Sequence, residues 1–253
     1  MIPTVRSEML KATTVRSVPA LAIVAAGAAV LLAAVFVLSL PITQGTTVAQ
    51  MRPTDVVGAA LVGIDVAAVV LIVLGALVAG AEYPTGTIAP TYLLTPNRER
   101  VVVAKAVVVV VIAIAVAVVA AVLCAAVGQG ALLLAGRDGV PVDGRLLRTL
   151  AGSATGPVVH AVAGLVIAVV TRSTGGGVAG ALALLLVPGI VGWIDALGFL
   201  APLLPSAAVH GLAGVAQPGT AEYVAAAPAA LLLIGWIMAP VGIAAWRAGS
   251  RDV

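Results

Sequence analysis

Charged and aromatic residues are scarce in this chain: of 253 residues, 9% are charged and 3% are aromatic. Hydrophobic residues make up 62% of the sequence, and the mean hydropathy is +1.22. A water-soluble domain of this length needs far more polar surface than this composition supplies. The scarcity of charge therefore excludes an ordinary soluble enzyme or binding domain, and it indicates that the chain is surrounded by lipid.

Three further absences limit the chemistry of the chain. The single cysteine, Cys124, has no partner for a disulfide and is interpreted as a small apolar filler. No Gly-x-x-x-x-Gly-Lys-Ser/Thr phosphate loop occurs, so energy from ATP would have to come from another chain. The basic residues are scattered and lack interleaved aromatics, which argues against a nucleic-acid partner. We expect no cofactor, and nothing indicates that the chain is itself an enzyme.

Long apolar runs dominate what is present. A helix needs about 20 apolar residues to cross a membrane, and six runs qualify: 19–40, 56–81, 106–127, 150–170, 178–200 and 224–246. The third run is rich in valine, but a lone strand would leave its backbone unpaired in lipid, so a helix is expected. The first run has full spanning length and precedes five others, which favours a retained span over a cleaved signal peptide. The predicted fold is an all-α, polytopic membrane protein with a single transmembrane domain over 1–253.

The distribution of lysine and arginine predicts the orientation, because these residues concentrate on the cytoplasmic side of membrane proteins. If both termini are cytoplasmic, nine basic residues lie inside and four outside. The inside set is Arg6, Lys11, Arg16, Arg98, Arg100, Lys105, Arg172, Arg247 and Arg251, and the outside set is Arg52, Arg137, Arg145 and Arg148.

A short amphipathic segment precedes the first run. Apolar residues from Ile2 through Val5 and Met9 to Ala12 recur at helical spacing, while Arg6, Glu8 and Lys11 fall elsewhere on the helical wheel. We expect a helix that lies along the inner membrane interface.

The stretch 82–105 is the only sizeable polar segment between two long apolar runs. Glycine and proline interrupt it at Gly80, Pro84, Gly86, Pro90 and Pro96. Between the last two prolines, Thr91 to Thr95 can form one helical turn, with Pro90 tolerated at the first helical position. We expect this short helix to expose Tyr92, Leu93 and Leu94 on the cytoplasmic side, where a groove of a soluble protein could bind them. A plain interfacial loop is the alternative.

These residues resemble a known family. Glu82, the Gly86-Thr87 pair, Leu93-Leu94-Thr95-Pro96, the Arg98-x-Arg100 pair and Lys105 follow the second span and lead into the third. This pattern is similar to that of ABC-2 type permeases, the membrane subunits of ATP-binding-cassette exporters. The six-span layout, the one-arginine connection at Arg172 and the Leu204-Pro205-Ser206 sequence before the last span also match. The motif covers about a tenth of the chain, and the layout covers all of it.

The resemblance implies a function and partners. In that family, the segment after the second span is a coupling helix that docks on a cytoplasmic ATPase, and an amphipathic helix precedes the first span. The implied protein is an exporter permease in a bacterial cytoplasmic membrane, partnered by an ABC ATPase and by a second permease copy or paralogue. The residues implied in coupling are Glu82, Gly86, Thr87, Tyr92, Leu93, Leu94, Pro96, Arg98, Arg100 and Lys105.

Polar residues inside the apolar runs are candidates for a substrate pathway, because charge in the hydrocarbon is costly and usually faces a cavity or partner. Asp65 and His160 both fall ~15 Å from the outer ends of their spans, and Asp195 falls ~8 Å from its outer end. Asp65 and His160 at matching depth could line or gate a route for substrate. A structural interhelical hydrogen bond is the alternative.

Two other classes of function compete with an exporter. An intramembrane enzyme is disfavoured: Asp65 and Asp195 lack a Gly-x-Gly-Asp context, and Ser153 and His160 lie on one helix without a Gly-x-Ser-x-Gly elbow. A passive channel or a structural membrane subunit needs no motif, and it stays open as an alternative.

Overall fold

Six long apolar helices form the body of the molecule in the computed structural model, which describes residues 1–250 and all of their side chains except that of Asp195. Arg251, counted above among the inside residues, lies outside the described residues. Described spans long and apolar enough to cross a membrane are Ser17–Gln44, Pro53–Gly80, Arg98–Leu134, Gly144–Thr171, Thr174–Trp193 and Ala226–Ser250. The prediction of an all-α fold with six long apolar helices is thus confirmed, including the valine-rich third run.

The observed boundaries differ from the predicted ones. The first span, α2 (Ser17–Gln44), is longer at both ends than 19–40, and the second is divided at a turn into α3 (Pro53–Leu61) and α4 (Ile64–Gly80). The third, α6 (Arg98–Leu134), has 37 residues and so extends ~55 Å, well beyond the predicted 106–127. Asn97 caps it by accepting a 3.0 Å hydrogen bond from the Arg100 amide, which is why the helix begins in the polar segment.

The later spans also differ. The fourth is divided at Ala154 into α7 (Gly144–Ser153) and α8 (Thr155–Thr171), and α11 (Ala226–Ser250) forms the sixth. The fifth, α9 (Thr174–Trp193), ends seven residues before the predicted 200, and Asp195 begins the 3-10 helix η2 (Asp195–Leu203). The predicted loop after it contains α10 (Pro205–Ala213), which is bent by 53° from the preceding helical turns. A further 3-10 turn, η1 (Val48–Gln50), joins α2 to α3.

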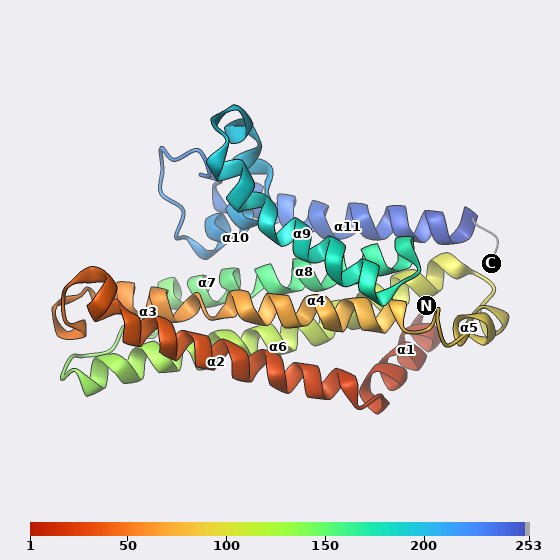
Figure 1. The fold of residues 1–253 in the computed structure, drawn as a ribbon, viewed down its shortest axis with the longest axis horizontal. Coiled ribbons are helices and arrows are strands. Elements are labelled where there is room, and N and C mark those ends of the chain that lie inside the picture. Colours follow the sequence, from red (N-terminus) through yellow and green to blue (C-terminus); the bar gives the residue numbers. More distant parts are fainter. Residues whose placement is uncertain (251–253) are drawn as a thin grey trace.

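The helices run side by side, with α4 and α8 at the centre (Figure 1). The spans that contain α4 and α8 have 56% and 61% of their apolar windows buried, whereas α9 has 17%. Glycines allow the central pair to pack closely: a Cβ on Gly75 would overlap the Ala161 carbonyl, and one on Gly164 would overlap the Ile72 carbonyl. Small residues are the usual means by which membrane helices approach one another closely.

The two ends of the bundle differ in what they carry. The N-terminal helix α1 (Ile2–Thr14), the short helix α5 (Ile88–Leu94) and the last turns of α11 lie at one end, called here the α5 end (Figure 1). The opposite end carries the α2–α3 connection and α10, and is called the α10 end. The prediction that the N-terminus, the end of the last span and the segment 82–105 share one side is consistent with this arrangement.

Candidate functional site

The polar segment after the second span folds into two tight turns, a short helix and an N-cap. The Tyr83 amide donates to the Gly80 carbonyl (3.3 Å), and Gly86 adopts a positive φ of 70°, a conformation that favours glycine. The Ile88 amide then donates to the Glu82 carbonyl (3.2 Å), which closes the loop on itself. The start of α5 is therefore held directly over the end of α4.

The short helix exists, but it begins earlier than predicted. It runs from Ile88 to Leu94, so Pro90 is its third residue, and Thr95 follows it. A proline within the first turn removes only an amide that has no intrahelical partner, so the helix tolerates it there. Ile88 is buried, whereas Leu93 and Leu94 are 81% and 87% exposed. The predicted exposure of both leucines is confirmed.

Tyr92 does not share this exposure, contrary to the prediction. Its ring lies under Arg98, whose guanidinium carbon is 5.2 Å from the ring centroid, and Tyr83 is its neighbour. Burial raises the pKa of both phenols, and the Tyr92 hydroxyl raises that of Tyr83 further. Both phenols therefore stay neutral at physiological pH. Tyr92 thus attaches one face of α5 to the bundle, while Leu93 and Leu94 stay exposed.

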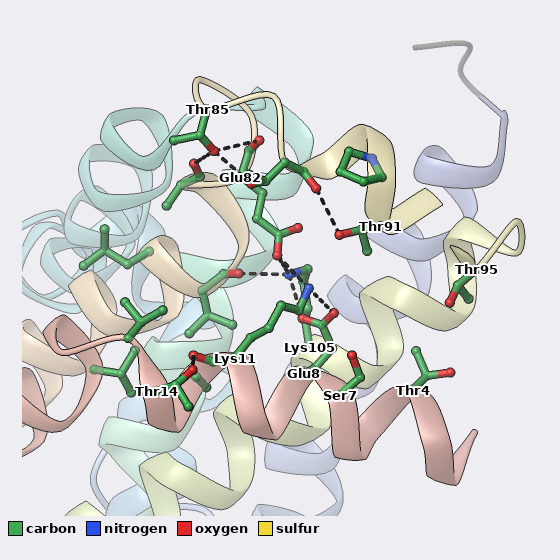
Figure 2. Close-up of a pocket in the computed structure, with 18 of the residues that line it drawn as sticks. Thr4, Ser7, Glu8, Lys11, Thr14, Glu82, Thr85, Thr91, Thr95 and Lys105 are labelled. Carbon is green, nitrogen blue, oxygen red and sulfur yellow. Dashed lines mark hydrogen bonds and ion pairs between the residues drawn. The ribbon is translucent and has the colours of Figure 1, made fainter. Parts of the chain in front are cut away.

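Four charged side chains converge beneath α5 (Figure 2). The Lys105 ammonium donates to Glu8 Oε2 and Glu82 Oε1, both at 2.8 Å, and to the Val78 carbonyl at 3.2 Å. The Lys11 ammonium donates to the same Glu82 oxygen at 2.8 Å and also pairs with the other Glu8 oxygen. We call Glu8, Lys11, Glu82 and Lys105 the charge quartet; it joins α1, the end of α4 and the start of α6.

The quartet is largely removed from solvent. The side chains of Glu8 and Lys105 are each 3% exposed, Glu82 is 15% exposed and Lys11 is 39% exposed. Burial lowers the pKa of Lys11, but its contacts with Glu8 and Glu82 outweigh burial and raise it overall, so this ammonium stays charged. Removing one member of such a buried set leaves an uncompensated charge, which is strongly destabilising.

The quartet corrects three interpretations of the sequence. Glu82 and Lys105 were placed in an exposed coupling segment, yet their side chains lie beneath α5, are 15% and 3% exposed, and bond to other parts of the same chain. Glu8 was placed on the polar face of an interfacial helix, yet it is buried, because α1 packs against α6 and turns this carboxylate toward Lys105. Glu8 and Lys11 were not identified as site residues. The signal that could have found them is two acids and two bases placed next to the ends of three apolar helices.

The remaining coupling candidates lie on the surface. Gly86, Thr87, Pro96 and Arg100 are exposed. The Thr87 hydroxyl forms a 2.9 Å hydrogen bond with that of Thr85 at the start of α5. The ten predicted residues thus divide into an exposed set and an internal set.

A cavity of about 690 Å³ opens between α1 and α5 at the α5 end. The charge quartet forms one wall, and threonine and serine hydroxyls line much of the rest (Figure 2). Apolar side chains complete the lining, among them Val18 from α2, Leu77 and Val78 from α4, and Leu94 from α5. This volume lies within the range of small-molecule sites, which is roughly 300–1,000 Å³.

Asp65 and His160 are not bonded to each other. The His160 Nδ1 atom lies 2.8 Å from the Gly156 carbonyl on its own helix, and Asp65 is exposed on α4. Asp65 is nevertheless close enough to His160 and to His210 of α10 for electrostatic interaction. His210 in turn lies 3.9 Å from Glu222. No group of three or more possible metal ligands occurs among residues 1–250 with described side chains.

Comparison with known proteins does not assign the chain to a family. No protein-family model, no curated protein and no solved structure matches the chain.

Proposed function

We propose that the chain is the permease subunit of an ABC-2 type exporter, driven by a separate cytoplasmic ATPase. The observation that carries this proposal is α5, a helix between two apolar spans that presents Leu93 and Leu94 outward at 81% and 87% exposure. A short helix with an exposed apolar pair, followed by Arg98 and Arg100, suits a groove on a soluble protein.

The connections of α5 support a mechanical role. It is joined to α4 and α6 by a few residues on each side, and Tyr92 attaches it to the bundle through Tyr83 and Arg98. The charge quartet binds α1, α4 and α6 together directly below it. A push on α5 would therefore move α4 and α6 together with α1, and α4 would carry the motion to α8, its closest neighbour.

We also propose how the subunits assemble and which membrane contains them. Two copies, or one copy and a paralogue, would enclose the pathway in a bacterial cytoplasmic membrane, with both termini cytoplasmic. Asp65 and His160, which influence each other electrostatically on α4 and α8, would line or gate that pathway near mid-depth. The chain would hydrolyse no ATP itself.

The orientation is tested by labelling introduced cysteines. Cysteine at Asn97, at the α5 end, should react with a membrane-impermeant maleimide only after the cells are opened. Cysteine at Gly139, at the α10 end, should react in intact cells. The background variant should replace Cys124, which is buried and so contributes little labelling. Labelling of the Asn97 variant in intact cells would invert the topology and remove the basis for docking on α5.

Docking is tested with the double substitution Leu93→Asp and Leu94→Asp. Burial of two leucines in a partner contributes about 3 kcal/mol or more, and two carboxylates in the groove would oppose binding further. The chain should therefore lose co-purification with any ABC ATPase that the unaltered chain retains when both are expressed together.

The matched control is the adjacent pair Leu133 and Leu134, which is 66% and 92% exposed at the α10 end. Aspartates there should leave co-purification unchanged. Normal ATPase recovery with the α5 variant, or equal loss in both variants, would exclude α5 as the coupling element. Ion conductance by the purified chain without any ATPase would favour a passive channel instead.

A further inference from the structure

The cavity between α1 and α5 combines an apolar wall with polar groups whose bonding is incomplete. Lys105 uses all three of its ammonium donors, on Glu8, Glu82 and the Val78 carbonyl. Lys11 has two carboxylate contacts, and its side chain is 39% exposed, so a third N–H is available to a ligand acceptor. One donor is therefore offered to the cavity.

One acceptor is left without a donor in the same wall. The Oε2 atom of Glu82 is shielded from solvent and receives no hydrogen bond from the residues that the structure describes. A buried carboxylate oxygen without a partner is costly, and a donor that enters from the cavity would relieve that cost after a small rotation of the side chain. Figure 2 shows the Glu82 carboxylate between the two lysines and the Thr91 side of the cavity.

The charge of the wall limits the ligand. The quartet holds two carboxylates and two ammonium groups, so it is formally neutral. A ligand with a net charge would be placed next to a site with no charge to balance it, whereas a zwitterion could match both open groups. Its cation must carry N–H groups, because Glu82 Oε2 lacks a hydrogen-bond donor.

The depth of the cavity indicates where such a ligand would come from. Lys105 lies seven residues after the start of α6, ~10 Å along a helix of ~55 Å that exceeds the ~30 Å hydrocarbon core. If α6 is centred in the bilayer, the quartet lies at the interface between headgroups and hydrocarbon. Val18, Leu77 and Val78 then line the side of the cavity that faces the hydrocarbon.

We propose that the α1–α5 cavity binds the headgroup of a phospholipid that carries a primary ammonium, as in phosphatidylethanolamine. The ammonium would donate to Glu82 Oε2, the phosphate would accept from Lys11, and the start of the acyl chains would lie against Val18 and Leu77. The site needs membrane placement of the helices, but it does not depend on docking of an ATPase on α5.

Native mass spectrometry of the detergent-purified chain tests the site. Phosphatidylethanolamine, phosphatidylcholine and phosphatidylglycerol with identical acyl chains are added separately. The ethanolamine lipid should bind at least about tenfold more tightly than the choline lipid, the factor that one charge-assisted hydrogen bond supplies. The Glu82→Gln variant should lose this preference because it no longer presents a carboxylate.

Variants on α1 keep the test independent of the quartet. Ser7 lines the cavity and is exposed, so Ser7→Trp should fill the space without disturbing the fold and should abolish tight binding. Thr13→Trp is the control, because Thr13 is exposed on the same helix but does not line the cavity.

Three results would overturn the proposal. Equal binding of the ethanolamine and choline lipids would exclude recognition of a primary ammonium. Unchanged binding to the Ser7→Trp variant would place the lipid elsewhere. Displacement of the lipid by free phosphoethanolamine at similar concentration would assign the cavity to a soluble ligand, because the acyl chains would then contribute nothing.

Discussion

Replacing Lys105 with methionine should lower the free energy of unfolding by about 3–5 kcal/mol, the usual cost of breaking a buried ion pair. The side chain is 3% exposed and is the only member of the quartet that bonds both carboxylates and the Val78 carbonyl. Methionine has similar length, so the loss is that of charge and hydrogen bonds. Glu8 would keep only Lys11 as a partner at a site closed to water.

Thermal unfolding in detergent would measure this loss. Arg100→Met is the control, because Arg100 lies on the same helix but is exposed, and its side chain should contribute little. The triple variant Lys105→Met, Glu8→Gln and Glu82→Gln should recover part of the stability, since it removes the uncompensated carboxylates. A Lys105→Met protein with the melting temperature of the Arg100→Met protein would show that the quartet does not hold the α5 end together.

Replacing Gly75 with alanine should destabilise the centre of the bundle by about 3 kcal/mol, near the upper end of the usual range for overpacking. The added Cβ would overlap the carbonyl oxygen of Ala161 on α8. Backbone cannot rotate away as a side chain can, so α4 and α8 would have to separate. These helices form the closest pair in the molecule, and their separation would loosen contacts on both sides.

The effect of a methyl group added at Gly75 can be compared with the same change at two further glycines. Gly242 lies in α11, and a Cβ added there would meet no atom within 4 Å beyond its chain neighbours and the backbone of its own helix, so Gly242→Ala should be neutral or stabilising by up to about 1 kcal/mol through helix propensity. Gly164→Ala should reproduce the Gly75 effect because it meets the Ile72 carbonyl from the other side. Equal melting temperatures for the Gly75 and Gly242 variants would mean that the close approach of α4 and α8 is not required.

The candidate site shows where prediction from sequence succeeded and where it failed. The short helix and the exposure of Leu93 and Leu94 could be predicted, because prolines, glycines and flanking charges act over a few residues. The position of Tyr92 could not, since it depends on Arg98 and on Tyr83, which turn the ring inward. The partners of Lys105 could not be predicted either, because Glu8 is 97 positions away in the chain.

Sequence alone determined that the protein consists of six long apolar helices with a polar segment after the second, because hydropathy and length are properties of each segment by itself. Only the tertiary structure decided what the charges do. An amphipathic pattern assigns Glu8 to water, yet the packing of α1 against α6 places it next to Lys105 and encloses both. A charged side chain can be buried when a group of opposite charge is paired with it. Whether such a partner is present depends on how segments distant in the sequence pack together.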